Sequence, residues 1–145
     1  MINYNEAIEI IKSEISKIKL HSEEVDIFES YNRILAEDVI ADVDLPPFDN
    51  SAVDGYAIKF SNKTQWKIIG EISAGNFNSF NISDEEAVLI TTGSRIPIGA
   101  DTIIPVEDVD VQSNILKLKA NAFIKKGMNI RTQGNDLRKN EIAIK

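Results

Sequence analysis

The sequence contains no cysteine, only one histidine and only one tryptophan. Without cysteine the chain forms no disulfide and no thiolate metal site, and His21 alone cannot form a cluster of histidine ligands. Apolar runs stay far below the roughly 20 residues of a membrane-spanning helix. The N-terminal MINYNEAIEI lacks the basic and then apolar pattern of a signal peptide. We therefore expect a cytoplasmic protein that makes no contact with a membrane.

Positive charge is scarce over most of the chain, whose formal net charge is −7. Residues 1–116 contain 8 Lys and Arg against 21 Asp and Glu, whereas residues 117–145 contain 8 against 2. So acidic a chain repels phosphates over most of its surface, and we expect no binding of nucleic acid. The basic residues 117–145 either form an ordinary solvated surface or attract an anion smaller than a nucleic acid.

The N-terminal segment has the pattern of an amphipathic helix. Asn3 followed by Glu6 resembles a capping pair, and apolar residues then recur at steps of three and four. This stripe consists of Tyr4, Ala7, Ile8, Ile11, Ile15 and Ile18. It packs either on its own domain or on a partner. The following EEVDIFES, in which Val25 and Ile27 alternate with acids, is typical of a strand.

Beyond residue 40 the pattern changes to short segments rich in β-branched and aromatic residues, with turn residues between them. These segments are GYAIKF, WKIIGEI, AVLITTG, DTIIPVEDV and ILKLKANAF, and VQSN and GSRIPIGAD are among the turns. Many short strands of this kind predict a compact β-barrel or sandwich. Pro46 and Pro47 remove two backbone donors and mark the boundary before it. The predicted fold class is therefore α+β, mainly β.

Three segments carry the polar residues of a candidate site. FDNSAVDGYA places two carboxylates, an amide and a hydroxyl in one loop, TTGSRIPIGAD follows an apolar strand, and GMNIRTQGNDLR comes near the end. A calcium-binding loop beginning at Asp49 would need a ligand at its fifth position and glycine at its sixth, where Val53 and Asp54 stand. The two signatures of an aspartic-protease dyad are absent as well. The second and third segments are each weak signals when taken alone.

Taken together and in this order, the three segments resemble the molybdopterin molybdotransferase family, which includes MoeA-type proteins and a domain of gephyrin. NRILAEDVIADVDLP, residues 32–46, resembles the stretch that precedes the first motif in that family. GND stands where Gly-Glu-Asp is more usual, which changes Asn135 but keeps Asp136. The resemblance covers essentially the whole chain.

The resemblance implies a function and a set of site residues. Family members use Mg2+ to insert molybdate into the dithiolene of adenylated molybdopterin with release of AMP, and they are homodimers. By correspondence with the family, Asp54, Thr92 and Asp136 are the catalytic residues, and Asp54 is also a candidate metal ligand. Asp54 would hold a cation or accept a proton; the alternative is that it only stabilises its own turn. The expected substrate-binding neighbours are Asn50, Ser51, Gly93 and Arg131.

The same resemblance predicts the domain organisation. Residues 1–45 would begin the first, dimerising domain, residues 46–140 would form a β-rich lid, and residues 141–145 would return to the first domain. Because NEIAIK starts a new alternating run, we expect a piece of a longer protein; the alternative is a natural terminus that pairs at a sheet edge. One alternative function is a non-catalytic dimerisation or scaffold module. Another is an oligonucleotide-binding barrel, which the scattered positions of Phe48, Phe77, Phe80 and Phe123 disfavour.

Overall fold

The computed structural model describes residues 2–75 and 80–145, so Phe77 lies outside the described residues. The chain forms two compact units. One runs from Met1 to Asp38 and includes Lys145, and the other runs from Val39 to Ile144. The predicted ranges 1–45, 46–140 and 141–145 concern the domains of a longer protein and stay predictions. No helix in the described residues is long and apolar enough to cross a membrane.

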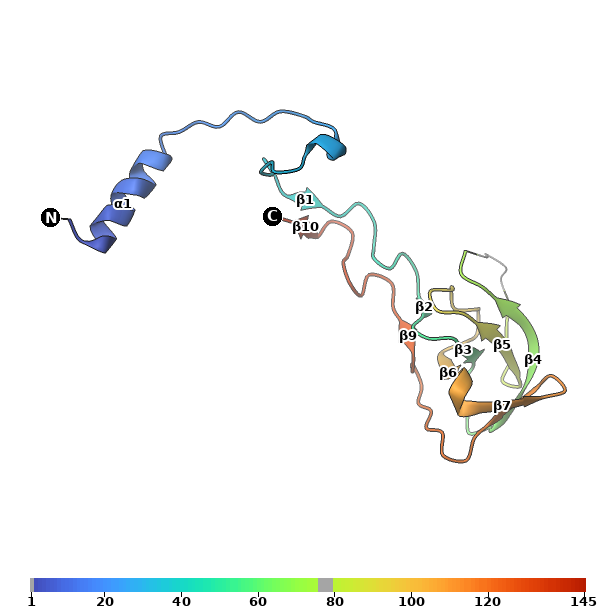
Figure 1. The fold of residues 1–145 in the computed structure, drawn as a ribbon. Coiled ribbons are helices and arrows are strands. Elements are labelled where there is room, and N and C mark those ends of the chain that lie inside the picture. The colour runs from blue at the N-terminus through green and yellow to red at the C-terminus, as the bar shows by residue number, and fades with distance from the viewer. Residues whose placement is uncertain (1, 76–79) are drawn as a thin grey trace. The chain divides into compact units, whose positions relative to one another are not determined.

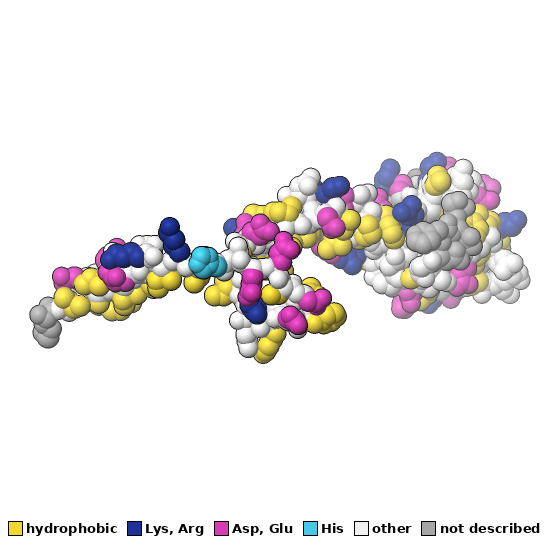
Figure 2. Space-filling model, turned by 90° about the horizontal axis from the view of Figure 1, so that it is seen from above, with side chains coloured by type: hydrophobic (Ala, Val, Ile, Leu, Met, Phe, Trp, Pro, Cys, Tyr) yellow, Lys and Arg dark blue, Asp and Glu magenta, His cyan; other side chains and the backbone are white. Residues whose placement is uncertain are grey.

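The first unit contains the expected helix, α1, Tyr4–Ile15. The Asn3 side chain caps it by accepting a hydrogen bond from the Glu6 N–H at 2.9 Å, as the sequence predicts. The helix ends before Ile18, so the last residue of the predicted stripe lies beyond it. Apolar side chains gather along one side of the helix and charged ones along the other (Figure 2). None of residues 2–40 is buried, so this stripe has no core of its own.

The prediction of a strand at EEVDIFES is wrong. Ile27–Glu29 form a short 3-10 helix, η1. The Asp26 carboxylate accepts the Phe28 N–H at 2.9 Å, and its carbonyl accepts the Glu29 N–H at 2.9 Å. Aspartate commonly closes such local turns, and here they compete successfully with a strand, because no neighbouring strand pairs with these described residues.

The second unit begins and ends with one antiparallel ribbon. β1, Val39–Ile40, pairs with β10, Ile142–Ile144, so the alternating run near the C-terminus is a strand (Figure 1). Further along, Leu45 bridges to Leu137, and the Leu45–Pro46 peptide bond is cis. Residues 39–45, which lead into the β-rich part of the unit, and residues 137–144, which lead out of it, thus lie side by side.

The β-rich part is a six-stranded sheet with the order β6-β3-β5-β4-β8-β7. Only β4 and β5 run parallel to each other. The edge strands β6 and β7 are consecutive in the sequence and only the short 3-10 helix η2, Val106–Asp108, separates them. A sheet with its two edges joined so closely must curl, and β4 is visibly bent (Figure 1). The bounds are β3 Gly55–Ile58, β4 Gln65–Ile72, β5 Glu86–Ile90, β6 Thr102–Pro105, β7 Val109–Gln112 and β8 Ile115–Leu118.

The predicted fold class, mainly β with an N-terminal helix and a barrel-like sheet, is confirmed.

One turn is shorter than expected. VQSN was predicted to be a turn throughout, but Gln112 still belongs to β7, and only Ser113 and Asn114 connect it to β8. Both have positive φ, of 50° and 62°, which suits a tight two-residue hairpin whose twist matches that of the strands.

Alternation along the strands gives this sheet a buried cluster on each face. The inner cluster draws on all six strands, which is what a curled sheet requires: Tyr56, Ile58, Trp66, Ala87, Ile104, Val109 and Leu116. The outer cluster consists of Ala57, Ile72, Ile82, Val88, Ile90 and Ile103. Because neighbouring residues such as Ile103 and Ile104 serve opposite clusters, both faces must be covered.

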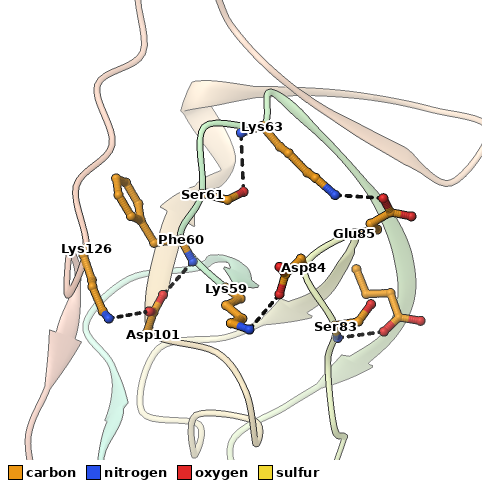
Figure 3. A network of polar contacts seen from close by, with 10 residues as sticks. Lys59, Phe60, Ser61, Lys63, Ser83, Asp84, Glu85, Asp101 and Lys126 are labelled. Atoms are coloured by element: carbon orange, nitrogen blue, oxygen red, sulfur yellow. Dashed lines mark hydrogen bonds and ion pairs between the residues drawn. The ribbon is translucent and has the colours of Figure 1, made fainter.

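Polar contacts surround the C-terminal end of β3 (Figure 3). The Asp101 carboxylate accepts the Phe60 N–H at 2.7 Å and also pairs with Lys126 at 3.4 Å. Lys59 pairs with Asp84 at 2.8 Å. The opposite, N-terminal end of β3 is Gly55, and the FDNSAVDGYA loop leads into the strand there.

The inner cluster should dominate the stability of the second unit. Ile104 is fully buried in it, and Ile104→Ala should lower the free energy of unfolding by about 2–5 kcal/mol. Ile98 is 64% exposed, and Ile98→Ala should change it by less than about 0.5 kcal/mol. Urea unfolding of the two variants measures both values. Equal losses would contradict the assignment of the core.

Candidate functional site

The three polar segments of the sequence lie side by side in the structure. β2, Asn50–Ser51, pairs antiparallel with β9, Ile130–Arg131. On its other side the Ser51 N–H donates to the Ser94 carbonyl at 3.0 Å, and the Gly93 N–H donates to the Ser51 carbonyl at 2.9 Å. The FDNSAVDGYA loop is thus the middle of three segments. We call residues 49–54, 91–96 and 129–136 the site layer.

The site layer rests on the outer face of the curled sheet. Val53, Ile96 and Ile130, one from each segment, pack against the outer cluster. Each segment is therefore fixed to the sheet by an apolar side chain and to its neighbour by backbone hydrogen bonds. The parts of each segment next to these anchors are therefore held on a rigid support.

Two of the predicted substrate-binding residues lie beneath the surface of this layer. Ser51 is fully buried, and its hydroxyl donates to the Val53 carbonyl at 2.5 Å. Asn50 is 5% exposed and its amide donates to the Phe48 carbonyl at 3.2 Å. In this structure both side chains support the loop from within.

Asp54 and Thr92 are in direct contact at the surface. The Thr92 backbone N–H donates to Asp54 Oδ1 at 2.7 Å, and the Thr92 hydroxyl donates to the same atom at 2.8 Å. These two bonds, the backbone one first, hold the pKa of Asp54 below its ordinary value, against a smaller opposing effect of desolvation. Asp54 is therefore ionised at neutral pH. Among the described residues, nothing donates a hydrogen bond to its other oxygen, Oδ2.

Glycines beside this pair explain two features of the motifs. A Cβ on Gly55 would lie 2.3 Å from the Ile104 carbonyl oxygen, so only glycine lets the chain after Asp54 enter the sheet. Gly93 follows Thr92 with φ +82° and has open space beside it. Gly93 therefore serves the turn by its backbone, which presents Thr92 to Asp54.

The third segment presents a second exposed carboxylate. Asp136 forms an ion pair with Arg131, and the Asn135 amide donates to it at 3.3 Å. The Arg131 hydrogen bond is the main reason why the pKa of Asp136 lies below its ordinary value, with Asn135 contributing as well. Arg131 is at the same time the backbone partner of Asn50 in β9.

The structure thus groups the predicted residues into two contacting pairs. Asp54 with Thr92 is one pair and Asp136 with Arg131 is the other, and β2 connects them through the backbone. Among the side chains that the structure describes, no hydrogen bond joins one pair to the other. The described residues also contain no group of three or more His, Cys, Asp or Glu side chains placed to hold a metal ion.

Two aspartates in the layer and next to it were not predicted to take part. The Gln133 N–H donates to Asp49 Oδ1 at 2.7 Å. Asp44 accepts the Lys139 N–H at 2.8 Å and the Gln133 side-chain amide at 2.7 Å. Their partners lie more than eighty residues away in the sequence, so no local pattern reveals them. The guanidinium of Arg95, in the second segment, lies over the Phe48 ring, 4.5 Å from its centre.

The fold of this chain is similar to that of solved proteins of molybdopterin biosynthesis. A crystal structure of the molybdopterin biosynthesis moeA protein from Pyrococcus horikoshii OT3 matches with a TM-score of 0.76 and 34% identity, over 85% of this chain and 34% of that one. A second moeA structure, from Pyrococcus horikosii, matches over 100% of this chain and 38% of that one, with a TM-score of 0.74 and 31% identity.

The chain belongs to the MoeA family: the family model described as "MoeA N-terminal region (domain I and II)" matches residues 2–145. The molybdopterin molybdenumtransferase of Synechococcus elongatus is 33% identical over 147 aligned residues, which cover 95% of this chain and 36% of that protein. The Haemophilus influenzae protein of the same name is 35% identical over 85% of this chain and 31% of its own length. The chain therefore spans about a third of these curated relatives.

The pKa of Asp54 should respond to its neighbour. Thr92→Val keeps the shape of the side chain and the backbone donor but removes the hydroxyl donor, so the pKa should rise toward the ordinary aspartate value without reaching it. Because the folded pKa is depressed, the stabilisation by this contact is present at neutral pH and is lost as the pH falls through the folded pKa. Titration of the Asp54 carboxyl carbon by NMR measures this, with Thr64→Val as the control. An unchanged pKa in Thr92→Val would contradict the geometry.

Proposed function

We propose that this chain is the N-terminal part of a molybdopterin molybdenumtransferase that inserts molybdate into adenylated molybdopterin. The observation that carries the proposal is the exposed contact of Asp54 with Thr92, held in one layer with Asp136. All three residues stand at positions that correspond to the family's motifs. Membership of the MoeA family supports the class of reaction, and we place the protein in the cytoplasm.

The state of Asp54 favours one of its two candidate roles. Its lowered pKa makes it a weak proton acceptor, and both Thr92 donors bond Oδ1, so no described residue donates to the other oxygen of the ionised carboxylate, Oδ2. Molybdate and the adenylate phosphate are anions and would be repelled by this charge. We therefore assign to Asp54 the binding of a cation, which would offset the repulsion between the carboxylate and the oxyanions.

Mg2+ fits this role. It commonly binds proteins through only one or two carboxylates, completing its coordination with water and substrate phosphates, so a group of three acidic ligands is not needed. Asp54 would hold it, and the ion would supply neutralising charge beside the anionic substrates. Thr92 fixes the direction of the Asp54 carboxylate, and Arg131 limits the repulsion from Asp136 by pairing with it.

The first unit supports a larger assembly. Ile11, Ile15 and Ile18 are 52%, 59% and 63% exposed, and such a row of apolar side chains gains stability when another surface covers it. We propose that further parts of a longer chain and a second copy in a homodimer provide this surface. The scaffold alternative uses the same surface but leaves Asp54, Thr92 and Asp136 without a role.

Charge at Asp54 should be required for turnover. In the full-length protein Asp54→Asn keeps the size of the side chain and an oxygen for the Thr92 donors, so the melting temperature should change little. Removal of the charge should lower the rate of molybdenum insertion by about 10²–10³-fold, as expected for the loss of one electrostatically stabilising group. The assay follows conversion of adenylated molybdopterin at fixed molybdate and Mg2+. Turnover close to wild type would leave Asp54 only a turn-forming role.

Residues 1–145 alone should not carry out the reaction. Side chains of the site layer cannot accelerate it unless another surface positions the pterin, since proximity and orientation supply much of a rate enhancement. Incubating the purified chain with adenylated molybdopterin, molybdate and Mg2+ should release no AMP above the background rate. AMP release that depends on Asp54 would show that this chain contains a complete active site.

A further inference from the structure

Asp49 contacts both of the other segments of the site layer. Its carbonyl accepts the Ile96 N–H at 3.1 Å, and its side-chain Oδ1 accepts the Gln133 N–H at 2.7 Å. The first bond reaches the segment that carries Thr92, and the second reaches the turn that carries Asp136. Asp49 itself belongs to the segment that carries Asp54. One residue thus ties together the three places where the predicted catalytic side chains stand.

Asp44 holds the same turn from a second side. Its two oxygens accept the Lys139 N–H and the Gln133 side-chain amide, at 2.8 Å and 2.7 Å. The carbonyls of Leu45 and Pro46 accept the backbone N–H groups of Asp136 and Gly134, both at 2.9 Å. Residues 133–139 are therefore fastened to residues 44–49 along their whole length.

The ladder between β2 and β9 does not fix this turn by itself. It ends at Arg131, and Asp136 stands five residues further on. The apolar contact of this segment with the sheet also lies before the turn, because it is made by Ile130, which packs on the outer cluster. Among the described residues between Arg131 and Asp136, one backbone N–H donates to a side chain of the first segment. It is the N–H of Gln133, which donates to Asp49 Oδ1.

We propose that Asp49 is a positioning residue, assisted by Asp44, which fixes the turn carrying Asp136 relative to the loop carrying Asp54 and Thr92. Asp49 touches no reacting atom in this role and acts through the Gln133 N–H. The proposal rests on the proposed function for its effect on turnover. Its structural part, the attachment of residues 133–139, can be tested without any activity.

The experiment compares Asp49→Ala, Asp49→Asn and the control Asp110→Ala in the full-length protein. Asp110 is exposed on β7 and accepts no hydrogen bond from a described side chain, so its removal deletes a carboxylate elsewhere on the same unit. Hydrogen–deuterium exchange of residues 132–139 and steady-state kinetics with adenylated molybdopterin are measured for each variant.

Asp49→Ala should speed exchange of the Gln133 amide within residues 132–139 by about tenfold, because that amide loses its acceptor. It should lower kcat by about 10- to 100-fold with little change in KM, because misplacing a catalytic group affects the reaction more than binding. Asp49→Asn retains an oxygen acceptor and should restore both quantities to near wild type. Asp110→Ala should change neither.

Three results would overturn the proposal. Unchanged exchange in Asp49→Ala would show that the bond does not hold the turn. Faster exchange with unchanged kcat would show that the position of the turn does not matter. Normal exchange with lost turnover in Asp49→Asn would make Asp49 a catalytic residue, since only its charge is missing. A wild-type protein that is inert in the assay would overturn the proposed function, and the exchange measurement alone would then decide whether Asp49 holds the turn.

Discussion

The site depends on the backbone pairing of one short strand, β2, with a neighbour on each side. Ser51 exchanges hydrogen bonds with the 91–96 segment, and β2 pairs with β9. Residues far apart in the sequence are thereby held within one layer, and the buried hydroxyl of Ser51 keeps the middle segment in shape. This pairing gives the segments that carry Thr92 and Asp136 a common frame.

The curled sheet beneath the layer makes the frame rigid. Its outer cluster receives one apolar anchor from each of the three segments, and its strand β3 starts immediately after Asp54. Gly55 is needed at that point because the chain passes against the Ile104 carbonyl. The packing of the sheet and the position of the ionised Asp54 carboxylate are therefore parts of the same constraint.

Much of the fold could be predicted from sequence because its signals are local. Alternating segments marked the strands, Asn3 and Glu6 marked the helix start, and Asp54 stood out beside Gly55. The attachment of the site was not predictable in this way, because Asp49 reaches a partner 84 residues away and Asp44 one 95 residues away. The alternation at EEVDIFES suggested a strand, but Asp26 closes a local turn there and no strand among the described residues pairs with this segment.

The proposed function requires that carboxylates on two different segments, Asp54 and Asp136, act in a single site. The direct measurement is molybdenum insertion by full-length Asp54→Asn, Asp136→Asn and the double variant. Groups that act as a unit show strongly non-additive losses, so the double variant should lose about as much activity as the worse single variant. Losses that multiply in the double variant, with all three proteins folded, would contradict the account.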